Sequence, residues 1–333
     1  MQTSGVRTKP IEIKMKVNIT ANMKNRCRQA AFAAVMAVVL LSGRLTQAQT
    51  TNLLVDVPVP PDEIQMLDER CNYIVDNYWK RLNYKGAFSS LERMDATLGQ
   101  FFALTPYASR DTVEMALNSL ITGVEKADAK NLVTLARMAE RWCATDTAEY
   151  ASEDLMLPFA RAVAESKKVK GPEKEYYAAM ARRMSNSRRG VAPADFEFYT
   201  PGKAKGRLSD ITDPTVLLFF YDPDNIDCRL DRIRLGNDLV VKILLQNSLL
   251  KIVAVYPGEP DEKWEKDAAD MPDGWIIGAA PGIDKDFTIK KLPDLYFLDQ
   301  DRVITDKDFS TESAIRYFGQ FARQRPAAPS DTK

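Results

Sequence analysis

Apolar residues in the first half of the chain recur every three or four positions, which is the spacing that places them along one face of an α-helix. The first series is formed by Ile64, Leu67, Cys71, Ile74 and Tyr78. Five further series with the same periodicity lie within residues 91–104, 113–124, 132–142, 155–163 and 176–184. We therefore expect six amphipathic helices that pack as a compact bundle.

Residues that begin or end helices separate these series. Ser109 and Ser152 precede the third and fifth series, Pro106 follows the second, and Gly171-Pro172 lies between the fifth and the sixth. Pro158 falls within the fifth series. Because proline lacks the backbone N–H that a helix interior uses, we expect Pro158 to lie in the first turn of that helix.

After Gly190 the pattern changes to short apolar runs that alternate with helices, which is typical of a sheet flanked by helices. The two longest runs are almost uniformly apolar, as central strands are. The expected elements are a strand at 216–221, a helix at 229–245 with a break at Gly236, a strand at 250–256, a hairpin of 295–298 and 302–304, and a helix at 312–321. The fold class is therefore α + α/β, a helical bundle followed by a central sheet.

The start of the chain has the pattern of a secretion signal. Met23–Arg28 is basic, residues 30–41 are small or apolar, and small residues precede Gln49. The apolar run is too short to cross a bilayer stably. We predict a cleaved signal peptide, a mature chain that begins at Gln49 without a membrane anchor, and a periplasmic or secreted location. An uncleaved anchor helix is the alternative, which the early end of the run at 42–44 disfavours.

Composition excludes several kinds of chemistry. The chain has no histidine, so Ser-His-Asp and Cys-His hydrolases and His-ligated metal sites are ruled out. Its 46 basic and 46 acidic residues cancel, which gives no reason to expect a nucleic-acid partner. No cofactor is predicted.

The mature chain keeps three cysteines. Cys27 leaves with the signal peptide, and Cys71, Cys143 and Cys228 remain. In an oxidising compartment Cys71 and Cys143 could be bridged. Each lies on an apolar helical face, where a buried free thiol is the commoner state, and the free state is therefore favoured.

One segment carries a resemblance to a known family. The run Asp222-Pro-Asp-Asn-Ile-Asp-Cys228 follows the strand at 216–221 and opens a helix, and it resembles the active-site segment of thioredoxin-like proteins. Leu292-Pro293-Asp294, which precedes a strand, resembles their cis-proline. Residues 190–196 resemble the leading sequence of exported thiol-disulfide oxidoreductases that serve cytochrome maturation. The resemblance covers residues 190–323 and implies a thioredoxin-like sheet.

The whole chain resembles an uncharacterised exported family in which a helical domain of unknown function precedes a thioredoxin-like domain. The resemblance rests on Tyr221-Asp-Pro-Asp before the dithiol site, on the Tyr256–Glu259 turn, on Trp264 and on residues 274–276. The predicted domains are a signal peptide at 1–48, with Met23 as an alternative start, a helical domain at 49–188, a thioredoxin-like domain at 189–325 and a disordered tail at 326–333.

The sequence departs from this family at the position that attacks the substrate. Disulfide exchange uses one thiol to form a mixed disulfide and a second, three residues on, to release the product. Here Asn225 takes the attacking position and Cys228 the resolving position. Asn225 is a good N-cap whose side-chain oxygen can accept the backbone N–H near Cys228. Cys228 is either a monothiol nucleophile or an inert, inward-facing thiol, and the inert interpretation is favoured because Asp224 and Asp227 oppose a thiolate.

The other motif position is Pro293. In the proteins it resembles, this proline is cis and presents backbone groups to an extended peptide; the alternative is a rigid turn before the strand. Asp222, Asp224 and Asp227 could be imagined as a calcium site, but no glycine turn or later glutamate completes such a loop. Acidic residues at the start of a helix are the preferred interpretation, and no metal site is predicted.

The leading functional hypothesis is a redox-inactive or vestigial module that binds a protein or peptide in the periplasm and uses its helical domain for a second contact. The alternative is a thiol-disulfide oxidoreductase or monothiol exchange enzyme that acts through Cys228. A peroxidase of the peroxiredoxin type is disfavoured because no Thr-x-x-Cys occurs in this segment.

Overall fold

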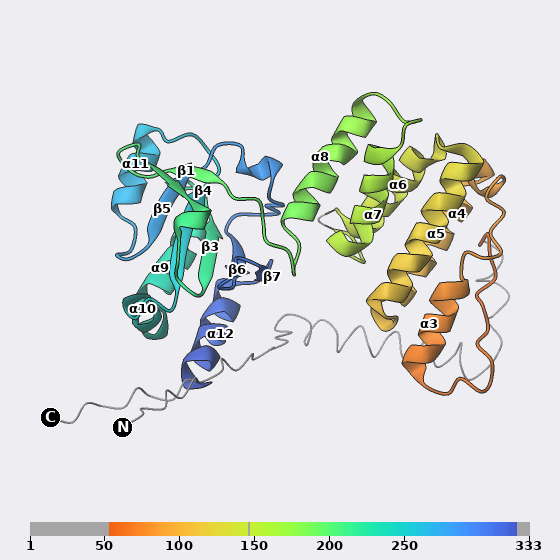
Figure 1. The fold of residues 1–333 in the computed structure, drawn as a ribbon, viewed down its shortest axis with the longest axis horizontal. Helices are drawn as coiled ribbons and strands as arrows, with labels where there is room; N and C mark the ends of the chain where they lie inside the picture. The colour runs from red at the N-terminus through yellow and green to blue at the C-terminus, as the bar shows by residue number, and fades with distance from the viewer. Residues whose placement is uncertain (1–52, 146, 325–333) are drawn as a thin grey trace, which may run out of the picture. The chain divides into compact units, whose positions relative to one another are not determined.

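The computed structural model describes residues 53–145 and 147–324 (Figure 1). The described residues belong to one compact unit. The predicted signal peptide and the predicted tail lie outside the described residues. The boundary between helical and thioredoxin-like domains at 188–189 remains a prediction. Within the described residues no helix is both long enough and apolar enough to span a bilayer.

The six predicted helices of the first half are present (Figure 1). Their bounds are α3 Leu67–Asn77, α4 Leu91–Leu104, α5 Arg110–Asp128, α6 Asn131–Cys143, α7 Glu153–Glu165 and α8 Pro172–Asn186. Large aromatic side chains are buried in the core of the bundle, among them Phe101 and Phe102 of α4 and Trp79 of the turn after α3. Cys71 and Cys143 are buried in this core as free thiols, so the disulfide alternative is not adopted.

The residues expected to begin helices do so. Ser109 Oγ accepts the backbone N–H of Thr112 at 3.2 Å, and Ser152 Oγ accepts that of Leu155 at 3.3 Å. These bonds satisfy amide groups that have no partner within their own helix. Gly171 has φ of +88°, and this left-handed conformation turns the chain into α8.

The expectation for Pro158 is wrong. Because α7 begins at Glu153, Pro158 lies beyond the first turn, and the helix continues through it. Proline gives up one backbone hydrogen bond there. The residues on either side, Leu157 and Phe159, are buried in the bundle, and their packing keeps the segment helical.

The second half is built on a seven-stranded mixed sheet, in the order β2-β1-β5-β4-β3-β6-β7. The strands are β1 Glu197–Tyr199, β2 Lys205–Arg207, β3 Val216–Phe220, β4 Lys251–Tyr256, β5 Ile276–Ala279, β6 Asp294–Leu298 and β7 Ile304–Lys307. β3, β4 and β5 are parallel, whereas β6 runs antiparallel to β3. The predicted central strands and the hairpin are therefore present.

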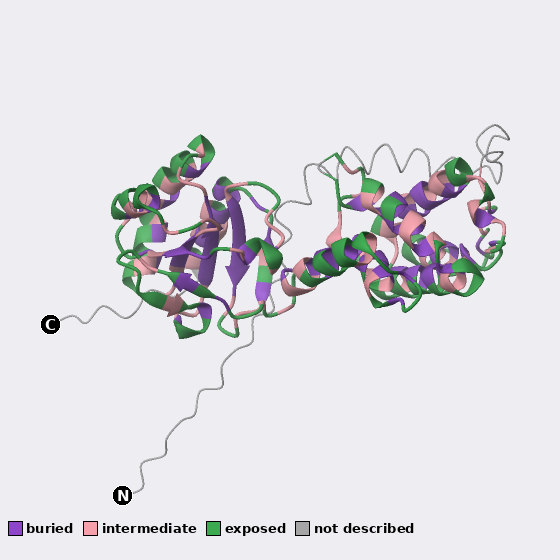
Figure 2. Ribbon diagram, turned by 90° about the horizontal axis from the view of Figure 1, so that it is seen from above, coloured by how far each residue is buried: buried purple, intermediate pink, exposed green. Residues whose placement is uncertain are grey.

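Side chains of β3 alternate between two buried clusters on opposite faces of the sheet. Leu217 and Phe219 pack with residues of four helices, α9 Ile226–Asn237, α10 Leu239–Gln246, α11 Glu262–Ala269 and α12 Thr311–Gln324. Leu218 and Phe220 pack on the other face, against Phe287 and Tyr296. Figure 2 shows the strands as the buried interior and exposed residues along the helices.

Most element ends differ from the expectation by one to four residues, and two of these differences have a visible cause. The break between α9 and α10 lies at Asp238 instead of Gly236, because Asp238 adopts an extended conformation and its carboxylate accepts the N–H of Val241 at 3.0 Å. β7 begins at Ile304, because Arg302 lies in the turn at φ +61° and donates to the carbonyl oxygens of Ile211 and Asp213.

Candidate functional site

The predicted motif lies where β3 ends and α9 begins. Asn225 is the N-cap of α9. Its Oδ1 accepts the backbone N–H of Asp227 at 2.8 Å and that of Cys228 at 3.2 Å. The predicted capping role of Asn225 is confirmed, and its amide oxygen is committed to the first turn of the helix.

The amide nitrogen of Asn225 faces a distant part of the chain. Nδ2 donates to the backbone carbonyl of Leu292 at 3.1 Å. The Leu292–Pro293 peptide bond is cis. The structure thus brings Asn225, Cys228 and the segment containing Pro293 together, as the motif predicts, and a single side chain connects the helix start to the loop before β6.

Cys228 is buried, only 2% exposed. Its Sγ accepts the backbone N–H of Asp222 at 3.5 Å, a contact that favours a thiolate. Burial acts in the opposite direction and is the larger effect, with Asp222, Asp231 and Asp227 adding to it, so that the pKa of the thiol rises to about 11. At neutral pH Cys228 is a protonated thiol.

The three acidic residues near the motif have separate roles. Asp222 Oδ1 accepts the N–H of Asp224 at 2.8 Å, which stabilises the turn. Asp224 forms an exposed ion pair with Lys263, and Asp227 lies in the first turn of α9. No group of histidine, cysteine or acidic side chains in the described part of the chain is arranged to hold a metal ion.

A second polar cluster begins at the residue that follows Pro293. Asp294 is buried, and its carboxylate accepts the backbone N–H of Lys290 at 3.1 Å and of Leu295 at 3.0 Å. Burial, with a smaller contribution from the charge of Asp308, raises the pKa of this carboxyl to about 7 against the opposing effects of the two backbone donors and Lys307.

Lys307 is the buried cation of this cluster. It forms an ion pair with Glu153 at 2.6 Å, and both side chains are about 90% buried or more. The ammonium group lies 5.2 Å from the ring centre of Tyr296 and 3.4 Å from its hydroxyl. That hydroxyl donates to the carbonyl of Thr288 at 2.6 Å. Glu153 begins α7, so this pair connects the helical half to β7.

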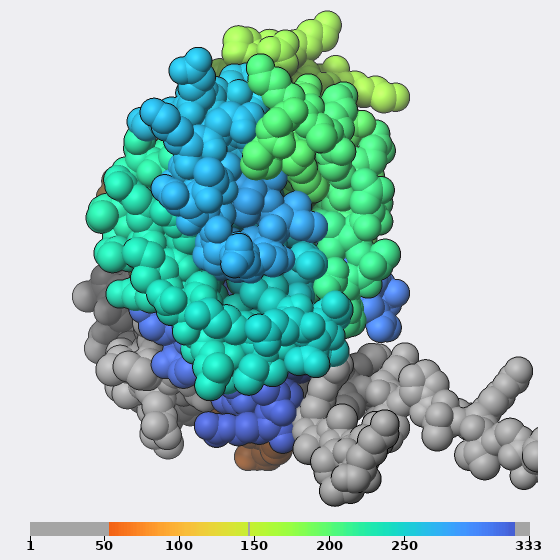
Figure 3. Space-filling view, turned by 90° about the vertical axis from the view of Figure 1, so that its left-hand side faces the viewer, coloured from red at the N-terminus to blue at the C-terminus, as the bar shows by residue number. Residues whose placement is uncertain are grey.

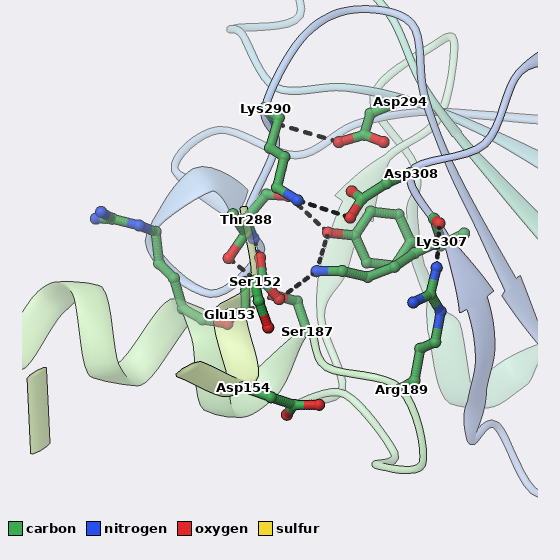
Figure 4. Close-up of polar contacts among 12 residues, drawn as sticks. Ser152, Glu153, Asp154, Ser187, Arg189, Thr288, Lys290, Asp294, Lys307 and Asp308 are labelled. Atoms are coloured by element: carbon green, nitrogen blue, oxygen red, sulfur yellow. Dashed lines mark hydrogen bonds and ion pairs between the residues drawn. The ribbon is translucent and has the colours of Figure 1, made fainter. Parts of the chain in front are cut away.

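Figure 4 shows these residues converging from helix, loop and strand. Lys290 pairs with Asp308 at 2.7 Å, and the hydroxyl groups of Ser187 and Thr288 lie 3.0 Å apart. Glu153 Oε1 is buried without a hydrogen-bond partner among the described residues. The cluster therefore contains charges of both signs, most of them removed from water.

The first half of the chain matches a known protein family. Residues 20–187, half of the sequence, match a family described as a domain of unknown function (DUF5106). The chain belongs to this family. Among curated proteins, none matches it.

In this DUF5106 protein the helical domain precedes a thioredoxin-like fold. The chain is similar to a thioredoxin-like protein from Bacteroides caccae, with a TM-score of 0.64 and 20% identity over 80% of this chain and 98% of that one. It is also similar to a conserved protein of unknown function from Bacteroides fragilis, with 32% identity over 39% of this chain and 98% of that one, at a TM-score of 0.38.

A third similar structure is the thioredoxin domain of a thiol-disulfide oxidoreductase from Bacteroides vulgatus, with 16% identity over 40% of this chain and 97% of that one, at a TM-score of 0.36. The Bacteroides caccae match covers 80% of the DUF5106 chain, so it includes both the helices and the sheet. It supports the predicted α + α/β architecture.

Sequence reasoning missed the long-range contacts within each of the two clusters. The bond from Asn225 to Leu292 joins residues 67 positions apart, and no local pattern signals it. Lys307 and Glu153 carry a weak signal only, since a charged residue in a short strand or at the start of a helix is usually solvated.

Proposed function

We propose that the protein is an exported thioredoxin-like module that binds a peptide or protein segment in the periplasm and does not exchange disulfides. The observation that carries this proposal is the bonding of Asn225, whose amide caps α9 through its oxygen and holds the Leu292 carbonyl through its nitrogen. A carboxamide cannot form a mixed disulfide, and this one is occupied on both sides.

The remaining thiol supports the same conclusion. A thiol with a pKa of about 11 is ionised to roughly one part in ten thousand at pH 7, and only the thiolate attacks a disulfide. Burial of Cys228 also shields its sulfur from a protein substrate. The Asn225–Cys228 pair is therefore interpreted as a dithiol motif that has lost its attacking sulfur.

The binding part of the proposal rests on the segment beside Asn225. Leu292 and Pro293 are both partly exposed, and they lie next to the N-terminus of α9 through the Asn225 bond. In the thioredoxin-like proteins that this segment resembles, the corresponding backbone receives an extended peptide. The export signal that the sequence predicts in residues 23–48 supports a periplasmic location.

A second candidate is monothiol exchange through Cys228. The contact that favours it is the Asp222 N–H donated to Cys228 Sγ, because such a bond stabilises a thiolate. Burial and the neighbouring carboxylates outweigh that contact, so we place this activity second.

Reduction of insulin by dithiothreitol tests the redox part. We expect the wild type and Cys228→Ser to match the uncatalysed rate. Asn225→Cys is the matched control: it restores two thiols three residues apart, and mass spectrometry is expected to detect a disulfide between positions 225 and 228. Wild-type turnover well above background that is lost in Cys228→Ser would establish the monothiol enzyme instead.

Amide-resolved NMR tests the binding part, with reduced and alkylated lysozyme as the unfolded polypeptide probe. We expect signal changes confined to residues 290–295 and 222–228. Changes confined to the helical half, or none at a saturating probe concentration, would contradict the proposed location of the binding surface.

A further inference from the structure

Large apolar side chains are exposed on α9 and on the following helix α10. They are Ile226 (61% exposed), Leu230 (45%), Ile233 (54%), Leu239 (70%) and Ile243 (45%). These are five of the twelve exposed large apolar side chains in the described chain. Figure 3 shows α9 and α10, in blue-green, as part of the surface that faces the viewer.

The three side chains on α9 form a continuous stripe, because a spacing of four and then three residues keeps them on one side of a helix. The opposite side of the same helix packs on the sheet through Cys228 and Leu235. α9 is therefore apolar on two sides, whereas a helix that faces only water and its own core needs one such side.

Two charged residues flank this stripe symmetrically. Asp227 and Arg234 are exposed and lie seven residues apart, which is nearly two full turns and places them on the same flank of α9. Their midpoint falls beside Leu230, the central residue of the stripe. An acid and a base equidistant from the centre of an apolar stripe make the helix complementary to an antiparallel copy of itself.

We propose that α9 and α10 form the interface of a symmetric homodimer whose two-fold axis passes beside Leu230. When two identical helices pack antiparallel, each flank faces the same flank of the other copy. Asp227 of each chain then lies opposite Arg234 of the other. Leu239 and Ile243 extend the apolar contact beyond α9.

The other charges on α9 are compatible with this packing. Arg229 lies on the opposite flank, and its Nη2 donates to the Asp224 carbonyl at 3.4 Å, which turns the guanidinium toward the N-terminus of its own helix. Arg234 already contacts Asp231 and Glu312 through Nη1. Its Nη2 can donate across the interface.

The dimer leaves the candidate site of each copy at an outer end of the helix pair. Asn225 precedes the midpoint by five to six residues, so the two N-caps are separated by roughly 16 Å along the axis. The interface includes Ile226 and Asp227 from the 222–228 segment of the proposed binding surface, but neither the amide of Asn225 nor the Leu292 carbonyl takes part in it, so self-association is tested separately from peptide binding.

Sedimentation of the purified protein between roughly 1 and 200 µM, a range that detects dissociation constants in the micromolar region, tests the apolar contact. We expect a reversible dimer for the wild type and a monomer for Leu230→Glu at every concentration. Met115→Glu, which alters a 59% exposed side chain on α5, is the matched control and is expected to remain dimeric. A wild type that stays monomeric throughout overturns the proposal.

Charge reversal tests the pairing of flanks. Asp227→Arg and Arg234→Asp should each weaken self-association at least about tenfold, because each places like charges opposite one another. An equimolar mixture of the two variants should form a heterodimer, in which both contacts pair opposite charges, and the double variant should form a homodimer. If both single variants keep the wild-type far-ultraviolet circular dichroism and their mixture does not associate, the antiparallel pairing is wrong.

Discussion

The start of α9 contacts Leu292, and the buried cluster around Lys307 includes Asp294, two residues later, yet polar groups have different surroundings in the two regions. At the start of α9 every polar atom of Asn225 bonds to backbone, and the thiol beneath it is protonated. Around Lys307, charges of both signs are buried together in the pair with Glu153. Shifted pKa values often mark reactive groups. In this molecule the carboxyl whose pKa is raised to about 7, that of Asp294, belongs to the cluster that joins the helices to the sheet.

Of the changes that test this comparison, removal of the buried cation should have the largest effect on stability. Lys307→Met leaves the carboxylate of Glu153 buried without a counter-charge and is expected to lower the free energy of unfolding by about 3–5 kcal/mol. Urea denaturation followed by tryptophan fluorescence measures the change. A loss below about 1 kcal/mol would show that the pair adds little.

Two controls separate burial from charge in that experiment. The double variant Lys307→Met/Glu153→Gln removes both charges and should recover part of the lost stability. Arg137→Ala breaks an exposed ion pair with Glu173 and should cost at most about 0.5 kcal/mol.

The second largest effect should be a dependence of stability on pH that comes from Asp294. The pKa of Asp294 is raised from 3.8 to about 7 in the folded protein, so between these values the folded state holds a proton that the unfolded state has released. Stability then falls as the pH rises through this window. We expect the wild type to lose about 1–3 kcal/mol more than Asp294→Asn between pH 4 and pH 8.

Urea midpoints of both proteins measured across this range provide the test. The comparison uses the difference between the two curves because Asp308, Lys307, Lys290 and Glu153 also lie in the cluster. Parallel curves would mean that Asp294 is ionised throughout, and the cluster would then have no group that titrates near neutrality.

The smallest effect is expected at the start of α9. Asn225→Asp keeps the oxygen that caps the helix but removes the N–H group donated to Leu292, and it should cost about 1 kcal/mol at pH 7. Asn225→Ala loses both contacts and should cost about 2 kcal/mol. Equal stability of Asn225→Asp and the wild type would show that the Leu292 contact contributes nothing.

Local patterns predicted most of the fold. The helix at 91–104 agrees with α4 at both ends, because Ser90 caps its start by accepting the N–H of Arg93 and the chain changes to a tighter turn at Pro106. The failure at Pro158 shows the limit of such patterns, since burial of the adjacent residues outweighed the local cost of proline. Short strands such as β1 and β2 lack enough residues to display a period.

The candidate site was predictable in its residues but not in its bonds. Asn225, Cys228 and Pro293 stand at positions that a strand-loop-helix pattern and a later proline indicate. The direction of the Asn225 amide depends on a loop 67 residues away. The burial of Lys307 depends on an acid from a helix 154 residues earlier, and neither distance appears in local periodicity.

The bond between Asn225 and Leu292 has a consequence for redesign. A cysteine substituted at position 225 supplies sulfur but also removes the brace that fixes the loop before β6. An engineered oxidoreductase on this scaffold would therefore need a second replacement that anchors residue 292 again. Without it, the new cysteine would supply a thiol but leave the loop before β6 less firmly held.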